Sequence, residues 1–225
     1  MSKTSHPYAL RIGILRTWKS RWFNTGKYRH LLKEDIGLRE LLAKKLRGMF
    51  VDSVDIERSP TSLNITIKTG RPGLLIGRGG EGIEKLKNEV VLWLNKTRTK
   101  EKKLEKLNPG AVKLNVEEIK TPEMYSNIVV EQIAQDLEKR LPFRRVMKQN
   151  LSKVMAVHEV EGVKIALSGR LDGAEMARYE WLREGKIPLQ TLRADVDFAR
   201  GRAHLPYGDL GIKVWIYKGE VFYKK

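Results

Sequence analysis

Hydrophobic positions recur along the first half of the chain at spacings that alternate between helix and strand. One stripe at helical spacing is formed by Leu38, Leu41, Leu42 and Leu46. We expect Asp35 to cap this helix and Gly48 to lie at its end. Strand-like patterns follow at 51–56 and 63–67, on either side of a turn at Ser59-Pro60-Thr61. The pattern therefore predicts a helix followed by a β-hairpin.

The same unit continues through a glycine cluster into a longer helix. The cluster occupies 77–82, and an apolar stripe at helical spacing runs from Ile83 to Leu94. Apolar and polar residues alternate again at 112–116, which predicts a third strand. The predicted order is helix, strand, strand, glycine loop, helix and strand.

Residues from 121 onward combine helices and strands in another order. Helices are predicted from Thr121-Pro122 to about Leu141, from Pro142 to about Met155, and at 174–183. Strands are predicted at 163–167, 192–198 and 212–216. We expect an α+β protein with an N-terminal arm at 1–30, one domain at 31–120, and a second domain at 121–225 in which a sheet packs on helices.

The charge of the chain indicates a polyanionic partner. The 225 residues carry a net charge of +17, while 41% hydrophobic residues suffice for a buried core. Nucleic acid is the partner that such an excess favours. In the arm, basic residues and aromatic residues are interleaved without any acid between 11 and 29. We expect RNA contacts from Arg11, Arg16, Lys19, Arg21, Trp22 and Lys27.

The glycine cluster fits two motifs with different functions. Residues 77–82 match the G-x-G-x-x-G pattern of dinucleotide sites, but about eight residues separate them from the preceding strand, whereas such sites begin directly after one. Gly77-Arg78-Gly79-Gly80 also fits the GXXG loop with which KH domains clamp a nucleic-acid backbone. Glycines let the loop approach phosphates and Arg78 supplies charge, so we favour RNA binding by these four residues.

A cluster of cations lies at the start of the helix that follows Pro142. Arg144 and Lys148 are four residues apart and share a helix face, with Arg145 adjacent. The sequence has no acid between Lys139 and Lys153 to pair with them. We expect this patch to face phosphates.

Other chemistries find little support in the sequence. The chain has no cysteine, and its four histidines lack the spacing of metal ligands. No catalytic residue, metal or cofactor is therefore predicted. Asp195 and Asp197 could serve acid–base chemistry, but nearby arginines favour an ion-paired sheet face. No apolar run reaches the ~18 residues of a membrane span. We expect neither a membrane partner nor a small-molecule substrate.

Several motifs together resemble the family of bacterial small-subunit ribosomal protein three, the uS3 family. The resemblance covers the whole chain and is carried by Leu10-Arg11-Ile12-Gly13-Ile14, Trp18-Lys19-Ser20-Arg21-Trp22, Ile76-Gly77-Arg78-Gly79-Gly80, Gly169-Arg170-Leu171, Thr191-Leu192-Arg193-Ala194-Asp195 and Gly211-Ile212-Lys213-Val214-Trp215-Ile216. It implies a type II KH domain, with a mixed three-stranded sheet backed by helices, followed by the C-terminal α+β domain of the family.

The resemblance also implies a function. It points to a structural, non-enzymatic constituent of the small-subunit head in the cytoplasm, binding rRNA and lining the mRNA entry channel. Arg144, Arg145 and Lys148 match the basic helix of that channel, where unwinding of mRNA would need no ATP. The implied neighbours are ribosomal proteins ten and fourteen, with two, four and five nearby. A nuclease or lyase acting on damaged DNA, known among eukaryotic relatives, is the alternative, and no motif in this sequence favours it.

Overall fold

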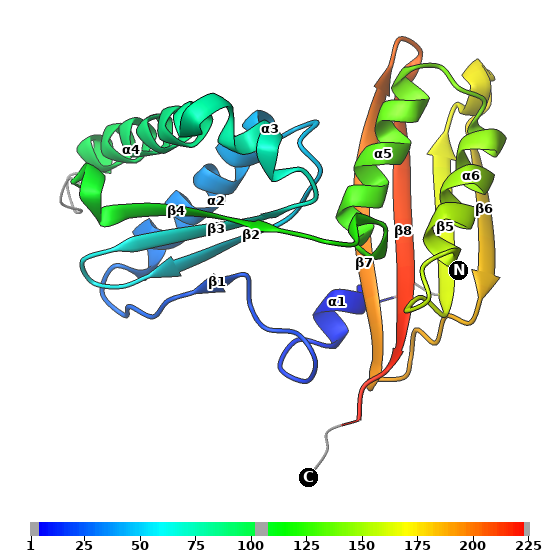
Figure 1. Ribbon diagram of the computed structural model, residues 1–225, viewed down its shortest axis with the longest axis horizontal. Helices are drawn as coiled ribbons and strands as arrows, with labels where there is room; N and C mark the ends of the chain where they lie inside the picture. Colours follow the sequence, from blue (N-terminus) through cyan, green and yellow to red (C-terminus); the bar gives the residue numbers. More distant parts are fainter. Residues whose placement is uncertain (1–4, 102–107, 223–225) are drawn as a thin grey trace. The chain divides into compact units, whose positions relative to one another are not determined.

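A computed structural model describes residues 5–101 and 108–222, which form two compact units (Figure 1). One unit runs from Trp18 to Lys120. The other combines the N-terminal residues up to Thr17 with the chain from Thr121 onward. The boundary at 120/121 is the one expected from the sequence. The predicted arm, by contrast, is divided between the two units.

The first unit is a mixed sheet with helices on one face. Its elements are β1 (Ser20–Arg21), α2 (Tyr28–Lys45), β2 (Val51–Arg58), β3 (Leu63–Thr69), α3 (Pro72–Ile76), α4 (Glu81–Glu101) and β4 (Val112–Glu118). The strand order is β1-β2-β3-β4, in which β2 and β3 are antiparallel while β1 and β4 run parallel to their neighbours. The sheet has one strand more than predicted, because β1 is two residues long and carries no periodic signal.

The core of this unit lies between the sheet and the two long helices. Alternate residues of β3 are buried, and they pack against the leucine stripe of α2 and the stripe of α4. The helix α2 starts at Tyr28, so the prediction that Asp35 caps it is wrong. Asp35 lies inside the helix and is only 3% exposed, because its carboxylate has partners elsewhere in the unit.

The second unit packs helices on one face of an antiparallel sheet. Its elements are α1 (Pro7–Leu10), α5 (Ser126–Glu138), α6 (Phe143–Met155), β5 (Gly162–Gly169), β6 (Arg178–Gly185), β7 (Ala194–Leu205) and β8 (Gly208–Glu220). The strand order is β6-β5-β8-β7. Figure 1 shows α5 and α6 side by side over this sheet. The short helix predicted at 174–183 is wrong: 178–185 is the edge strand β6, so the sheet has four strands.

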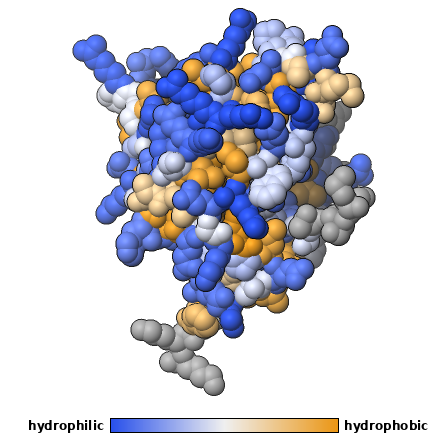
Figure 2. All heavy atoms as spheres, turned by 90° about the vertical axis from the view of Figure 1, so that its right-hand side faces the viewer, coloured by the Kyte–Doolittle hydropathy of each residue, from blue (hydrophilic) through white to orange (hydrophobic). Residues whose placement is uncertain are grey.

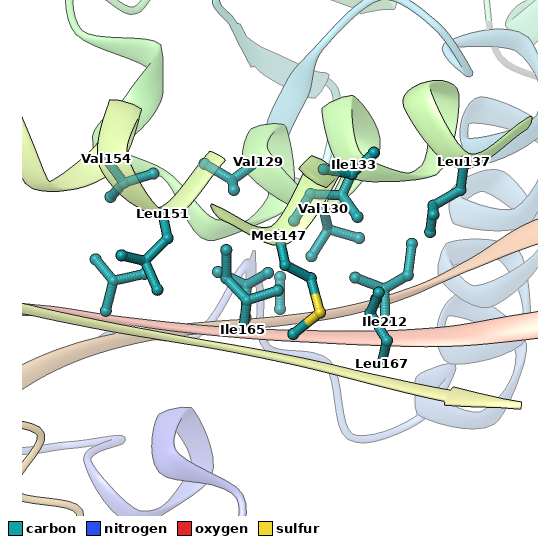
Figure 3. Packing of buried hydrophobic residues seen from close by; sticks show 14 of the residues in the cluster. Val129, Val130, Ile133, Leu137, Met147, Leu151, Val154, Ile165, Leu167 and Ile212 are labelled. Atoms are coloured by element: carbon teal, nitrogen blue, oxygen red, sulfur yellow. The ribbon is translucent and has the colours of Figure 1, made fainter. Parts of the chain in front are cut away.

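Figure 3 shows how this core is built. Val129, Ile133 and Leu137 descend from α5, and Met147 and Leu151 from α6, toward the apolar side chains of β5 and β8. The helices thus bury their apolar stripes against one face of the sheet. As a result, the polar face of α6, with Arg144, Arg145 and Lys148, points into solvent.

Candidate nucleic-acid interface

The glycine loop lies between α3 and α4 in a backbone conformation that favours glycine. Gly77, Gly79 and Gly80 have φ values of 69°, 63° and 86°, and a side chain is strained in this left-handed region. At Gly82 a Cβ atom would come within 2.6 Å of the Leu75 carbonyl oxygen. Glycine at these positions therefore makes the tight turn and the close approach of α3 to α4 possible.

The loop offers its backbone and one cation to solvent. Gly77, Arg78 and Gly79 are exposed, and no carboxylate among the described residues pairs with Arg78. Glu81 opens α4, and its carboxylate is held by Lys85 one turn later. A polyanion that approaches the loop meets an unpaired guanidinium, glycine backbone and a salt-bridged helix start. The dinucleotide-site interpretation fails on the same geometry, because α3 separates β3 from the glycines.

The α6 helix divides its residues cleanly between core and solvent. Phe143, Val146 and Met147 are buried, while the three predicted cations, Arg144, Arg145 and Lys148, are exposed. Together with Gln149 and Ser152, these cations line an open hollow of about 560 Å³. The structure thus brings together the three side chains that the sequence grouped.

The three cations of α6 have few ion-pair partners. The Nε of Arg144 lies 3.6 Å from a carboxylate oxygen of Glu180 on β6, and the Arg144 side chain is 72% exposed. Arg145 and Lys148 have no ion-pair partner within 5–101 and 108–222. Because an exposed pair at this distance contributes little, ~0–1 kcal/mol, all three cations are available to a phosphate.

Arg11 departs from the sequence expectation. The residue is 0% exposed. Its Nε donates to the carbonyl of Ala194 at 2.6 Å and one terminal nitrogen donates to that of Pro7 at 2.8 Å. The other terminal nitrogen reaches three further carbonyls, of Pro188, Leu189 and Thr191. Burial lowers the pKa of Arg11, with the charges of Asp195 and Arg16 acting in opposite directions. The prediction of a surface contact with RNA is wrong for Arg11, because protein carbonyls occupy its donors.

Arg16 is also tied to the second unit. Its guanidinium lies 2.6 Å from the Asp195 carboxylate. Burial lowers the pKa of Arg16, but the charge of Asp195, that of Asp197 and the hydrogen bond outweigh it, so the pKa is raised overall. Asp197 accepts hydrogen bonds from the backbone of Ser126 and Phe198 instead. Asp195 is thus ion-paired, but with Arg16 and not with the arginines near it in sequence, and Asp197 is a buried hydrogen-bond acceptor.

The remaining arm residues belong to the first unit. Trp22 donates through Nε1 to Asp35 at 2.7 Å, and Arg21 lies 3.3 Å from Glu57. The backbone carbonyl of Lys19 accepts hydrogen bonds from Arg39 and from the amide of Ile56. Lys27 is exposed and precedes α2. These contacts fix the backbone of the segment and leave its cations at the surface.

A buried charge network behind Trp22 was not found from the sequence. Glu34 and Asp35 face Arg58, which is 7% exposed, and Glu34 also pairs with Arg98 at 2.7 Å. The adjacent acids Glu34 and Asp35 are the only signal for it in the sequence, and of these the cap prediction involves Asp35 alone. The network holds Asp35 where it can accept from Trp22.

Comparison with known proteins covers both units. Residues 37–124 match the KH domain family, and 133–216 match the family described as ribosomal protein S3, C-terminal domain. Small ribosomal subunit protein uS3 of Desulforamulus reducens is 43% identical over 98% of this chain and 94% of its own length. That of Magnetococcus marinus is 42% identical over 100% of both chains.

The chain belongs to the uS3 family of ribosomal proteins. The family assignment confirms the resemblance found in the sequence, together with its KH domain and its α+β fold. As a uS3 protein, the chain has a structural role in the small ribosomal subunit. The glycine loop described above lies within the matched KH domain, and the cationic face of α6 lies within the matched C-terminal domain.

Among the described residues, no helix is both long and apolar enough to cross a membrane. The same residues contain no group of three or more histidine, aspartate or glutamate side chains placed to hold a metal ion.

Proposed function

We propose that this uS3 protein binds rRNA in the head of the small subunit and lines the mRNA entry channel with α6. The observation that carries the proposal is the exposed cluster of Arg144, Arg145 and Lys148 around one open hollow. These side chains project from a helix whose other face is core, so the charges are held on a rigid support. A cluster of this kind can bind the phosphates of an RNA strand that passes along the helix.

The same cluster supports an ATP-independent role in unwinding mRNA. Translocation pulls the messenger inward, and cations that hold the phosphates of an opened strand slow its re-pairing. Arginine at two of the three positions favours bidentate phosphate contacts. No nucleotide-binding motif is needed, because the motion of the ribosome supplies the work.

Triple replacement of Arg144, Arg145 and Lys148 by Ala tests this role. Each phosphate contact on a single strand contributes ~0.7 to the salt dependence of binding, so the slope should fall by about 2 at most. Ribosomes with the variant should translate through a stable hairpin more slowly and read unstructured messenger normally. Lys153→Ala, on the same helix but outside the hollow, is the matched control. Equal rates on hairpin messenger for variant and wild-type ribosomes would remove the unwinding role.

The KH loop is proposed as a second RNA contact, through Gly77, Arg78, Gly79 and Gly80. Aspartate at both Gly77 and Gly80 would place carboxylates where phosphates approach, and RNA affinity of the free protein should fall. Asparagine at the same two positions imposes the same left-handed strain without charge. A loss shared equally by both double variants would show that loop geometry, rather than phosphate contact, controls binding.

The other arm residues complete the proposed rRNA contacts. These are Arg21 and Lys27, which are exposed, and Arg16, Lys19 and Trp22, which are partly buried. In assembled subunits, cross-linking should place them on rRNA, and should place the protein beside ribosomal proteins ten and fourteen, with two, four and five nearby. Recovery of the protein in the cytoplasmic ribosome fraction after a high-salt wash is expected. Loss from the subunit in that wash would contradict a structural role.

We further propose that the protein has no enzymatic activity. Its family is ribosomal, and RNA binding is a sufficient role for the exposed cations of the glycine loop and of α6. Incubation with abasic, nicked and intact DNA duplexes should give no cleavage after stringent purification. Persistent cleavage of the abasic duplex would instead establish the DNA-processing alternative.

A further inference from the structure

The sheet of the second unit has a face that α5 and α6 leave open and on which, among the described helices, only the short α1 lies, at the Phe198 end of β7. Because α5 and α6 pack on one face, alternate residues of each strand point away from them. Strand register arranges these residues in cross-strand rows. The row Gly185-Gly162-Tyr217-Val196 is buried at Val196 and Tyr217, which pack against Leu189. Three further rows, which we call the first, second and third, are, going from β6 to β7, Arg183-Lys164-Trp215-Phe198, Trp181-Ala166-Lys213-Arg200 and Tyr179-Ser168-Gly211-Arg202. Each of these three rows contains an aromatic ring and at least one cation.

The alternation also separates the charges of the sheet by face. Glu180 lies on the helix side, near Arg144 of α6, and Asp197 is buried against the start of α5. None of the twelve positions in the three rows is acidic. Asp209, at the hairpin end beyond them, is bound to His204 at 2.6 Å. These three rows are therefore positively charged, in addition to the cations of α6.

The second and third rows form a shallow trough. Its floor consists of Ala166, Ser168 and Gly211, and a Cβ atom at Gly211 would lie 2.7 Å from the Ser168 Oγ. The aromatic wall is on β6, where Trp181 is 46% and Tyr179 is 55% exposed. Figure 2, which faces the β6 side of this unit, shows a largely hydrophilic surface with apolar patches; tryptophan and tyrosine count as weakly hydrophilic on its scale, so these patches come from other residues.

The opposite wall is cationic. Arg200, Arg202 and Lys213 are exposed and line a hollow of about 320 Å³ between β7 and β8. In the part of the chain that the structure describes, none of the three has an ion-pair partner. A row of aromatic rings thus runs parallel to a row of unpaired cations, with small side chains between them.

The first row closes one end of the trough. The ammonium of Lys164 lies 4.9 Å from the Trp181 ring and 5.2 Å from the Trp215 ring. Trp215 in turn lies 5.1 Å from Phe198, and the ring of His6 in the N-terminal segment lies 4.7 Å from Phe198. The Arg183 guanidinium also lies 5.8 Å from the Trp181 ring, so two cations of the first row order this ring, which remains 46% exposed.

We propose that this trough binds a single-stranded segment of RNA whose bases are unstacked. Bases would stack on Trp181 and Tyr179 while their phosphates lie along Arg200, Arg202 and Lys213. Residues two apart on a strand are separated by ~6.8 Å, so successive rows can serve successive nucleotides. Aromatic side chains on a sheet are an established way to stack bases, and every base has a face to stack. The inference rests on the proposed function only in that RNA is the partner.

The test uses the full-length protein with the α6 cations and the KH loop already disabled. On this background, Trp181→Leu with Tyr179→Leu should weaken binding of a 12-nucleotide single-stranded RNA by about fivefold or more. The variant keeps apolar bulk at the edge strand, so its circular dichroism should match the parent. Gln at Arg200, Arg202 and Lys213 should lower the salt slope by about 2. Replacement of Phe222, an exposed aromatic residue beyond the end of β8, by Leu is the control.

Position is tested with photoreactive 5-iodouridine in the same RNA, followed by mapping of the cross-linked peptides. Cross-links to β6 residues 179–181, competed by single strands but not by duplex, are expected. Unchanged affinity in both variants, with cross-links elsewhere, would overturn the trough while leaving α6 and the KH loop untouched. Cross-links from β6 to another ribosomal protein in intact subunits would overturn it too, because they would make the trough a protein interface.

Discussion

Replacing Arg11 with Met tests whether this side chain stabilises the protein or contacts RNA. Methionine retains an apolar stem of similar length but removes a guanidinium that donates to five backbone carbonyls. Two of these hydrogen bonds, to Ala194 and Pro7, are buried. Each acceptor left without a partner costs about 1–3 kcal/mol, so these two alone give about 2–6 kcal/mol.

A second effect acts in the opposite direction. Burial already disfavours the charged form of Arg11 and lowers its pKa, so removing the cation relieves part of that cost. We therefore expect a net loss of about 3 kcal/mol in the free energy of unfolding. At ~2–4 °C per kcal/mol, Tm should drop by about 6–12 °C.

Thermal unfolding followed by circular dichroism measures the loss, and RNA binding below Tm measures the alternative. Arg21→Met is the matched control, because its partner Glu57 lies 3.3 Å away and both side chains are about half exposed. That surface pair is worth ~0–1 kcal/mol. An unchanged Tm for Arg11→Met, with weaker RNA binding, would show that the reasoning about the buried guanidinium is wrong.

Three further outcomes are expected. Glu34→Ala should destabilise the first unit by about 3–5 kcal/mol in urea unfolding, because it removes the one carboxylate that pairs with both buried guanidiniums, those of Arg58 and Arg98. Gly201→Val should cost at least ~1–3 kcal/mol in the same assay, since a Cβ atom there would lie 2.3 Å from Val130. Burial, and then the charge of Arg200, lowers the pKa of His6. The unfolded chain therefore binds this proton more readily, and stability should fall as pH drops below about 6.5, but not in His6→Gln.

Local signals in the sequence were sufficient for the parts of the interface that one element makes by itself. The glycines at 77–80 need left-handed backbone, and that need is visible in residue type alone. The α6 helix combines a preceding proline, an apolar stripe and cations at helical spacing, so both its bounds and its exposed face follow from periodicity.

Elements with mixed signals depended on their neighbours. The segment at 174–183 is rich in helix formers at its start, yet 178–185 pairs with β5 as an edge strand. In an edge strand with one half-covered face, apolar and polar residues alternate only weakly. Its structure therefore depends on the neighbouring strand with which it can pair. Likewise, α2 extends seven residues before Asp35, because Arg58 and Trp22 supply the partners that let this acid lie inside a helix.

Only the tertiary structure could separate the cations by role. Arg11 and Arg144 are both arginines in basic segments of the sequence. Arg11 is enclosed by carbonyls from residues 188–194, whereas Arg144 faces solvent. The trough on the free sheet face depends on the register of four strands, which places Trp181, Lys213 and Arg200 in one row although they are far apart in sequence. Hydrophobic periodicity is a property of neighbouring residues, whereas enclosure and cross-strand alignment depend on segments that meet only when the chain folds.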